Sequence, residues 1–293
     1  PRCGGREFRK DRNILDVWFE SGSTNRVVLE GANGLSFPAD LYLEGSDQHR
    51  GWFNASLMVA IATRGEAPYR KVMTSGWTLD FQGRAMHKSL GNVVDPTLVI
   101  EKSGADVLRL WVASSDCFRD VRLSEEILER VKDSYRKIRN TFRFLLGNLS
   151  DFRPGEHSIP YEEMEELDKW VLGQLASLEK KVLAAYDVFE FHKVFHLVYN
   201  FLVTVLSSFY LDALKDRLYT FGRDCRKRRS AQTVLYELTL SFSKLLAPIV
   251  SHVAEEVWQH LPEDERREES VLLSPTREPN QSWIKEELNA RWT

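Results

Sequence analysis

In the first 115 residues, apolar positions occur in two patterns, which are short continuous runs and helical spacing. Short apolar runs at 41–43 and 71–74 predict two strands, each stopped by small or polar residues. Between them, the apolar side chains of segment 52–61 recur near helical spacing and predict a helix. A strand, a helix and a second strand in this order predict a βαβ unit with parallel strands.

Polar residues follow both predicted strands. Ligands of parallel sheets bind beyond the carboxyl ends of the strands. We therefore expect Glu44–Gln48 and Ser75–Trp77 at one sheet edge. The stretch Asp80–Asn92 is polar and without period, which predicts a loop, and Asp106–Ala113 returns to helical spacing.

From Ser124 onward the pattern is helical almost throughout. Ser124 is placed to cap a helix, and Asn148–Pro160, with its prolines and glycine, is the best linker candidate. An apolar stripe follows, and then two long helices are predicted at 191–218 and 230–261, the second interrupted by Pro248. Strand signals are absent here, so we predict an antiparallel all-α helix bundle after the α/β part.

The longest apolar stretch, Val194–Leu211, must be considered as a possible membrane span. It carries His196, Asn200 and Thr204, which are costly in lipid. We interpret it as a buried helix of the bundle and expect no membrane association.

The composition of the chain narrows the class of protein further. The chain has 293 residues, of which 43% are hydrophobic and 28% charged, and this excludes disorder and collagen. The net charge is −3, with +3 on the first 150 residues and −6 on the rest, so a polyanion must be bound by local patches. Cys3, Cys117 and Cys225 form no disulfide framework. With no visible signal peptide at the first residues, we expect a cytoplasmic location.

The segment Glu44–Trp52 sets two carboxylates and an amide at a strand-to-helix junction. Gly45 permits close approach of a ligand to the backbone. Asp47 can accept hydrogen bonds from ribose hydroxyls, and Glu44 can hold an ammonium group. The alternative is that Asp47 caps the helix and Glu44 is a solvated loop residue.

The segment Gly83–Asn92 is a second candidate, because a flexible loop with a lysine can wrap a polyphosphate. The alternative is a basic surface loop. A third segment, Asp16–Ser23, places aromatic residues beside an acid and can frame a pocket, although Trp18 and Phe19 also fit a hydrophobic core.

These three segments resemble the class I aminoacyl-tRNA synthetases, and specifically their bacterial isoleucyl branch. The match is closest along Tyr42–Phe53, and Met86–Ser89 corresponds to the family's Lys-Met-Ser-Lys-Ser loop. Asp133–Asn140, Phe209–Tyr219 and Arg229–Tyr236 resemble the family's anticodon-binding domain. The resemblance covers essentially the whole chain.

The resemblance implies the fold and its division. It implies a Rossmann-like half-domain at 1–115, the second half of the catalytic domain. A helical connection at 116–150 and an anticodon-binding helix bundle at 151–293 follow. It also implies isoleucine–tRNA ligase activity, in which ATP and isoleucine give isoleucyl-adenylate and the acyl group then passes to tRNA(Ile).

Site residues follow from the resemblance. Glu44, Gly45, Asp47 and Gln48 are expected to bind the substrate. Lys88 and Ser89 are the catalytic candidates, and Lys88, Asp47 and Met86 are expected to bind ATP, which carries Mg²⁺. Such catalysis is mostly positioning and electrostatics, so we assign no general base.

The loop departs from the family pattern in two places. Ala85 stands where the family has its first loop lysine, and His87 where it has its first serine. Losing one cation is expected to cost about 1–3 kcal/mol of transition-state stabilisation if nothing replaces it. Ser75 also replaces a histidine found in many relatives.

Several family parts are not found in the sequence. The His-x-Gly-His signature, the editing domain and the cysteine-rich zinc module are absent. We therefore expect this polypeptide alone to be inactive. Cys3 resembles half of a zinc knuckle, so a Zn²⁺ site is possible in a full-length enzyme but is not supported in this chain. His192 and His196 have the spacing of zinc ligands on a metalloprotease helix, but the acid of that motif is missing between them.

Two basic patches are candidates for tRNA phosphates. The first patch, segment 119–143, holds eight basic and five acidic residues, and its candidates for tRNA contact are Arg136 and Arg139. The second patch, the denser run 223–229, contributes the candidates Arg226, Arg228 and Arg229. Either patch also fits a solvated surface. The alternatives to an isoleucine enzyme are a valyl-type synthetase of the same class and a non-catalytic tRNA-binding module.

Overall fold

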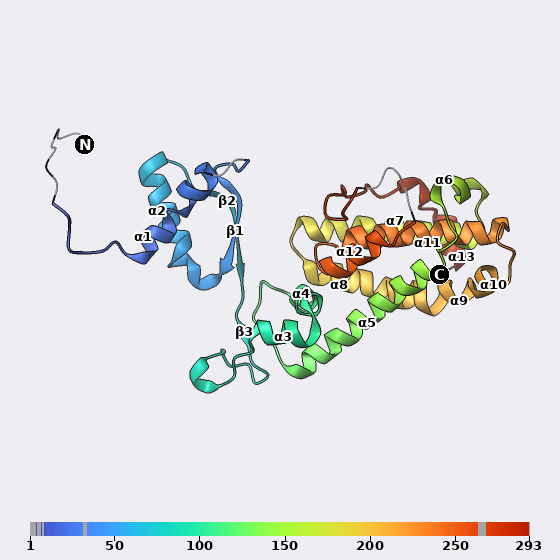
Figure 1. Ribbon diagram of the computed structural model, residues 1–293, viewed down its shortest axis with the longest axis horizontal. Helices are drawn as coiled ribbons and strands as arrows, with labels where there is room; N and C mark the ends of the chain where they lie inside the picture. The colour runs from blue at the N-terminus through green and yellow to red at the C-terminus, as the bar shows by residue number, and fades with distance from the viewer. Residues whose placement is uncertain (1–3, 5–6, 8, 32–33, 263–267, 293) are drawn as a thin grey trace. The chain divides into compact units, whose positions relative to one another are not determined.

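The computed structural model describes residues 1–293 apart from 1–3, 5–6, 8, 32–33, 263–267 and 293 (Figure 1). Its contacts divide into two compact units. The first comprises 1–77 with 118–120, and the second comprises 78–117 with 121–293. The divisions expected at 115 and 150 are not the edges of these units, and they stay predictions.

The first unit is built on a two-stranded parallel sheet. Strand β1 (Ala39–Gly45) pairs with β2 (Tyr69–Ser75), and helix α2 (Trp52–Arg64) connects them. The register sets Gly45 opposite Ser75. The predicted βαβ unit is confirmed, and so is the shared edge at which the two candidate segments begin. Shorter elements complete the unit: α1 (Val17–Gly22), η1 (Asn25–Leu29) and η2 (Ser46–His49).

Tyr42 fixes α2 against the sheet. Its ring stacks on that of Trp52 with centroids 4.1 Å apart and planes 5° apart. Its hydroxyl lies 3.0 Å from that of Ser56, which also accepts a hydrogen bond from the Asn25 side-chain amide at 3.0 Å. Because buried polar groups are costly unless paired, this chain of contacts allows a tyrosine in the core.

The second unit opens with short elements around a loop. Strand β3 (Thr78–Leu79) pairs in parallel with β4 (Val121–Arg122), and the loop between β3 and α3 (Pro96–Ser103) contains the turn η3 (Lys88–Leu90). The predicted loop and helix α4 (Ala105–Ser114) are confirmed. The sequence reasoning missed α3, although Asp95 accepts a hydrogen bond from the Thr97 amide and Pro96 occupies its first position.

A helix bundle forms most of the second unit (Figure 1). Its longer elements are α5 (Glu125–Gly147), α7 (Glu166–Asp187), α8 (Phe191–Asn200), η5 (Phe201–Tyr210), α11 (Arg226–Leu246) and α12 (Ser251–Gln259). Its shorter elements are α6 (Pro154–His157), η4 (Tyr161–Glu163), α9 (Leu211–Ala213), α10 (Lys215–Tyr219), η6 (Gln281–Trp283) and α13 (Glu286–Trp292). No strand lies beyond β4 in the described part of the chain, as predicted.

Helix boundaries follow the sequence signals with two exceptions. Ser124 caps α5 by accepting a hydrogen bond from the Ile127 amide at 3.3 Å, and the second long helix ends before Pro248, both as predicted. Helix α11 begins at Arg226, four residues earlier than expected. The segment predicted as a linker, 148–160, is packed, because Leu149 and Phe152 are buried in the core.

The apolar segment Phe191–Ala213 is long and apolar enough to cross a membrane, with a mean hydropathy of 1.6, and 44% of its most apolar window is buried. Val194, Val198 and Leu206 are among its residues in the bundle core. The prediction of a bundle helix is confirmed.

One carboxylate joins four elements inside the bundle. Asp168 on α7 has no exposed surface. It accepts hydrogen bonds from the Tyr210 hydroxyl at 2.7 Å, the Arg217 guanidinium at 3.0 Å and the Ser230 hydroxyl. Burial raises the pKa of Tyr210 well above its ordinary value. The phenol therefore stays protonated and donates to the carboxylate.

Candidate functional site

The first candidate segment lies at the end of β1, where the sequence predicts it. Glu44 and Asp47 are both exposed. The Asp47 carboxylate folds back over Gly45, and a Cβ at position 45 would lie 2.7 Å from Asp47 Oδ1. A side chain at position 45 would displace the carboxylate from this place, so the glycine permits the arrangement. The structure therefore brings together two of the residues expected to bind the substrate.

Gln48 takes the capping role that was considered for Asp47. Its Oε1 accepts a hydrogen bond from the Trp52 amide at 2.9 Å, at the start of α2. Its Nε2 donates to Asp47 Oδ2 at 3.1 Å. Gln48 thus orients the Asp47 carboxylate while Asp47 makes no cap. The structure thus gives the capping role to Gln48, and ligand binding by Asp47 stays a prediction.

The aromatic segment lies beside the same junction. A Cβ on Gly51 would lie 2.8 Å from the Trp18 ring, and the Trp52 indole donates to the Ser21 carbonyl at 3.0 Å. Asp16 caps α1 by accepting from the Trp18 amide at 2.8 Å. Trp18 and Phe19 are 45% and 49% exposed, so they are not core residues.

The end of β2 contacts a segment that the sequence reasoning did not connect with it. A Cβ on Gly76 would lie 2.2 Å from the Arg119 backbone, so this position requires glycine. The Trp77 amide donates to Asp120 Oδ1 at 2.8 Å. A contact across 43 residues has no signal in local spacing, which is why Asp120 was missed.

The second candidate segment is a tightly bonded loop in the second unit. Asp80 is buried, and its carboxylate accepts from the amides of Gln82 and Arg84, each at 2.9 Å. The Asn92 side chain joins it by donating at 2.8 Å. Lys88 and Ser89 lie exposed in η3, whereas Met86 is half-buried against the core.

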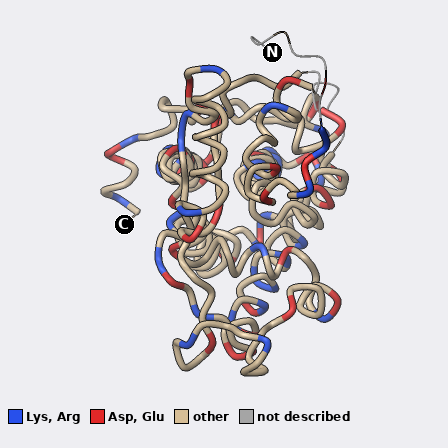
Figure 2. Tube along the Cα trace, turned by 90° about the vertical axis from the view of Figure 1, so that its left-hand side faces the viewer, with Lys and Arg blue, Asp and Glu red and all other residues tan. Residues whose placement is uncertain are grey.

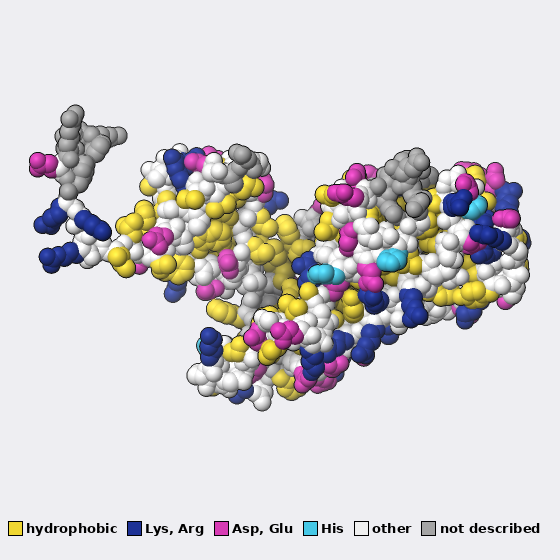
Figure 3. Space-filling view, in the orientation of Figure 1, with side chains coloured by type: hydrophobic (Ala, Val, Ile, Leu, Met, Phe, Trp, Pro, Cys, Tyr) yellow, Lys and Arg dark blue, Asp and Glu magenta, His cyan; other side chains and the backbone are white. Residues whose placement is uncertain are grey.

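The basic side of α5 is exposed. Figure 3 shows Lys and Arg side chains along the side of the bundle where α5 runs. Arg136 pairs with Asp133 at 3.0 Å, and Arg139 makes a two-pronged bridge to Glu256 at 2.7 and 2.8 Å. Asp and Glu positions are interspersed with Lys and Arg positions over the traced chain (Figure 2), so these arginines lie among charges of both signs.

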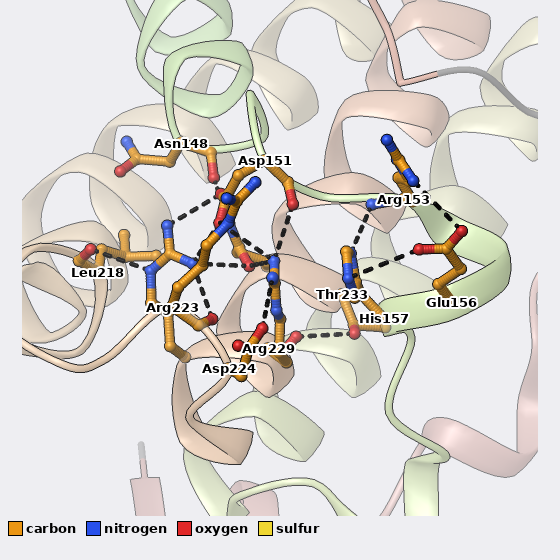
Figure 4. A network of polar contacts seen from close by, with 12 residues as sticks. Asn148, Asp151, Arg153, Glu156, His157, Leu218, Arg223, Asp224, Arg229 and Thr233 are labelled. Carbon is orange, nitrogen blue, oxygen red and sulfur yellow. Dashed lines mark hydrogen bonds and ion pairs between the residues drawn. The ribbon is translucent and has the colours of Figure 1, made fainter.

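The arginines of the second basic run differ in burial, and Figure 4 shows Arg229 in a network of polar contacts with Asp151. Arg226 is 60% exposed and pairs with Glu163, whereas the side chains of Arg228 and Arg229 are only 15% and 5% exposed. Both inner arginines bind Asp151, with Arg228 Nη1 2.7 Å from its carboxylate. The Arg228 guanidinium holds the pKa of Asp151 well below its ordinary value. A tRNA contact by the inner pair stays a prediction, but the structure gives both a role inside the bundle.

A cleft of about 470 Å³ lies between α5 and η5. Lys137, Phe144, Tyr199 and Lys215 are among the residues that line it. Sequence reasoning missed this cleft, because its walls are about sixty residues apart in the chain.

Comparison with protein families assigns both parts of the chain. Residues 2–124 match the family of tRNA synthetases class I (I, L, M and V). Residues 168–292 match the anticodon-binding domain of tRNA ligase. The chain belongs to the class I aminoacyl-tRNA synthetases. The resemblance inferred from the three segments is thereby confirmed.

Curated proteins similar to this chain include isoleucine–tRNA ligases. That of Moorella thermoacetica is 53% identical over 292 residues, covering 100% of this chain and 31% of the relative. That of Carboxydothermus hydrogenoformans is 54% identical over 276 residues, covering 93% of this chain and 30% of the relative. The chain thus spans about a third of the length of the curated relatives it matches.

Solved class I synthetases share the fold. A LeuRS–tRNA–LeuAMS ternary complex of Agrobacterium radiobacter superposes with a TM-score of 0.71 at 21% identity, covering 97% of this chain and 35% of that one. A Mycobacterium tuberculosis methionyl-tRNA synthetase with methionyl-adenylate gives 0.62 at 21% identity, covering 75% and 43%. The predicted fold class, an α/β half-domain followed by a helix bundle, is confirmed.

Metal-ligating residues do not gather in the described part of this synthetase chain. No group of three or more His, Cys, Asp or Glu side chains is placed to hold an ion there. Cys3, the zinc-knuckle candidate, lies outside the described residues. Cys117 and Cys225 are free thiols, and burial raises the pKa of Cys117.

Proposed function

We propose that this chain is part of an isoleucine–tRNA ligase, which activates isoleucine with ATP and transfers it to tRNA(Ile). The observation that carries the proposal is 49–54% identity to such enzymes along essentially the whole chain. This identity extends across the α/β part and the bundle together. It favours the isoleucine enzyme over a valyl-type synthetase and over a tRNA-binding module alone.

Glu44, Gly45, Asp47 and Gln48 bind the isoleucyl-adenylate in this proposal. The exposed Glu44 carboxylate holds the ammonium group of the amino acid. Asp47, oriented by the Gln48 amide, accepts hydrogen bonds from the ribose hydroxyls. The lack of a side chain at Gly45 supports this assignment, because it lets the Asp47 carboxylate lie over the end of β1, where we place the sugar.

Lys88 and Ser89 act on the phosphates. The isoleucine carboxylate attacks the α-phosphorus of ATP, a new C–O–P linkage forms, and the bond to pyrophosphate breaks. The attacking group is already ionised, so no general base is needed. Lys88 offsets the negative charge that develops on the phosphates, and Met86 anchors the loop near the nucleotide. ATP enters as its Mg²⁺ complex, with the ion held by the phosphates.

The tRNA lies along the exposed basic residues of the bundle. Arg136, Arg139 and Arg226 present guanidinium groups to solvent and are suited to phosphate contacts. Their carboxylate partners are themselves exposed, so exchanging them for phosphate costs little.

The test of function uses a chimera. In the Moorella thermoacetica isoleucine–tRNA ligase, the matching segment is replaced by this chain, hereafter the chimera. We expect isoleucine-dependent ATP–pyrophosphate exchange and charging of tRNA(Ile) by the chimera, and no exchange by the chain alone. Charging with valine, or exchange by the chain alone, would contradict the proposal. Binding of tRNA without exchange would favour the RNA-binding module.

The proposed tRNA surface can be tested by comparing Arg226 and Arg228, an exposed and a buried arginine in one turn of α11. Arg226→Ala and Arg136→Ala are each expected to weaken tRNA(Ile) binding by the chimera and to reduce the slope of log affinity against log salt by about 1. Arg228→Ala, next to Arg226 but buried against Asp151, is expected to lower the melting temperature, and a salt slope equal to that of the parent would remove Arg228 from the candidate tRNA contacts. Filter binding at several salt concentrations measures the slopes. Equal slopes for Arg226→Ala and the parent would remove Arg226 from the interface.

A further inference from the structure

We infer that Asp80 and Asn92 form a clamp that holds the loop between them in one shape and so positions Lys88 for the phosphates. Asp80 and Asn92 bound the loop predicted from the sequence, but the sequence motif assigned neither of them a role. The inference rests on the proposed function for its consequence in catalysis, but the clamp itself stands on contacts within the second unit.

The Asp80 carboxylate is the centre of the clamp. It accepts hydrogen bonds from three backbone or side-chain donors that follow it, the amides of Gln82 and Arg84 and the Arg84 Nε at 2.8 Å. The Asp80 amide donates in turn to the Arg84 carbonyl at 2.8 Å. These bonds close the first turn of the loop. The hydrogen bond from the Asn92 side chain, followed by those from Arg84, lowers the pKa of Asp80, so the carboxylate stays ionised throughout the neutral range.

Asn92 closes the other end. Its Nδ2 donates both to Asp80 Oδ2 at 2.8 Å and to the Ala85 carbonyl at 3.1 Å, and its Oδ1 accepts from the His87 amide at 2.9 Å. The amide group of one side chain therefore binds the backbone on both sides of Met86. Lys88 comes directly after the last of these contacts, so its position is tied to the clamp.

The clamp also gives Arg84 a structural role in the loop. Its guanidinium lies 2.8 Å from Asp80 Oδ2, so this cation is already paired within the loop. Arg84 is adjacent to Ala85, the position that lacks the family's first lysine. Arg84 thus serves the loop's shape, and Lys88 remains the residue that meets the phosphates.

Asn92→Ala in the chimera tests the inference. We expect faster amide hydrogen exchange in the peptide covering 82–91, and a 10- to 100-fold fall in kcat for ATP–pyrophosphate exchange with an unchanged KM for isoleucine. Asp95→Asn, which keeps a capping side chain on α3, is the control and is expected to match the parent in both measurements.

A double variant shows whether the clamp acts through Lys88. If it does, Asn92→Ala adds little to the loss already caused by Lys88→Met. If the fold losses in kcat of the two single variants multiply in the double variant, the positioning role is overturned. Unchanged hydrogen exchange in the Asn92→Ala variant would also overturn it. A parent chimera without exchange activity would refute the proposed function instead, and the hydrogen exchange of the loop would still decide whether the clamp exists.

Discussion

Replacing Lys88 by methionine is expected to slow isoleucine activation by the chimera about 10²- to 10³-fold. Methionine keeps the length of the side chain and removes its charge. A preorganised donor aimed at charge that develops in the transition state is worth about this factor in rate. Because Ala85 supplies no second cation and Arg84 is paired with Asp80, the loop has little with which to compensate.

The loss is expected in kcat for ATP–pyrophosphate exchange, with a smaller change in KM for isoleucine. Stopped-flow measurement of adenylate formation separates this step from tRNA charging. Lys181→Met, on the exposed surface of α7, is the control for loss of a lysine and is expected to leave the rate unchanged. A Lys88→Met rate within threefold of the parent would remove Lys88 from the chemistry.

The elements of this chain could be predicted wherever a local pattern specifies them. The apolar runs of β1 and β2 and the 3.6-residue stripe of α7 are such patterns, and Ser124 and Pro248 marked helix ends. The two-residue strands β3 and β4 are too short to show a period, and their pairing joins segments 43 residues apart. Their absence from the prediction follows from that length.

The candidate site was predictable as segments but not as a set of contacts. Glu44–Gln48 lies where the end of a parallel strand places it, since the βαβ order alone requires this. Charge runs were less informative, because the sequence 226–229 does not tell which arginines face inward. Asp151, far away in the chain, decides this by binding Arg228 and Arg229. The clamp likewise depends on Asn92 folding back twelve residues to Asp80.

Replacing Asp168 by alanine is expected to lower the free energy of unfolding of the chain by about 3–5 kcal/mol. The change leaves the Arg217 guanidinium, the Tyr210 hydroxyl and the Ser230 hydroxyl without their common acceptor inside the bundle. Breaking a buried ion pair by removing one partner costs about this much, because the remaining charge stays desolvated. Urea unfolding followed by circular dichroism measures the loss.

Asp133→Ala is the matched control, since Asp133 also pairs with an arginine but on the exposed side of α5. Exposed pairs of this kind contribute at most about 1 kcal/mol, so the two variants are expected to differ severalfold. The double variant Asp168→Leu with Arg217→Met removes both charges and is expected to recover most of the loss, because apolar residues of similar volume often replace a buried pair without cost. Equal losses in the single and double variants would mean that the hydrogen bonds, rather than the stranded charge, determine the stability of the bundle.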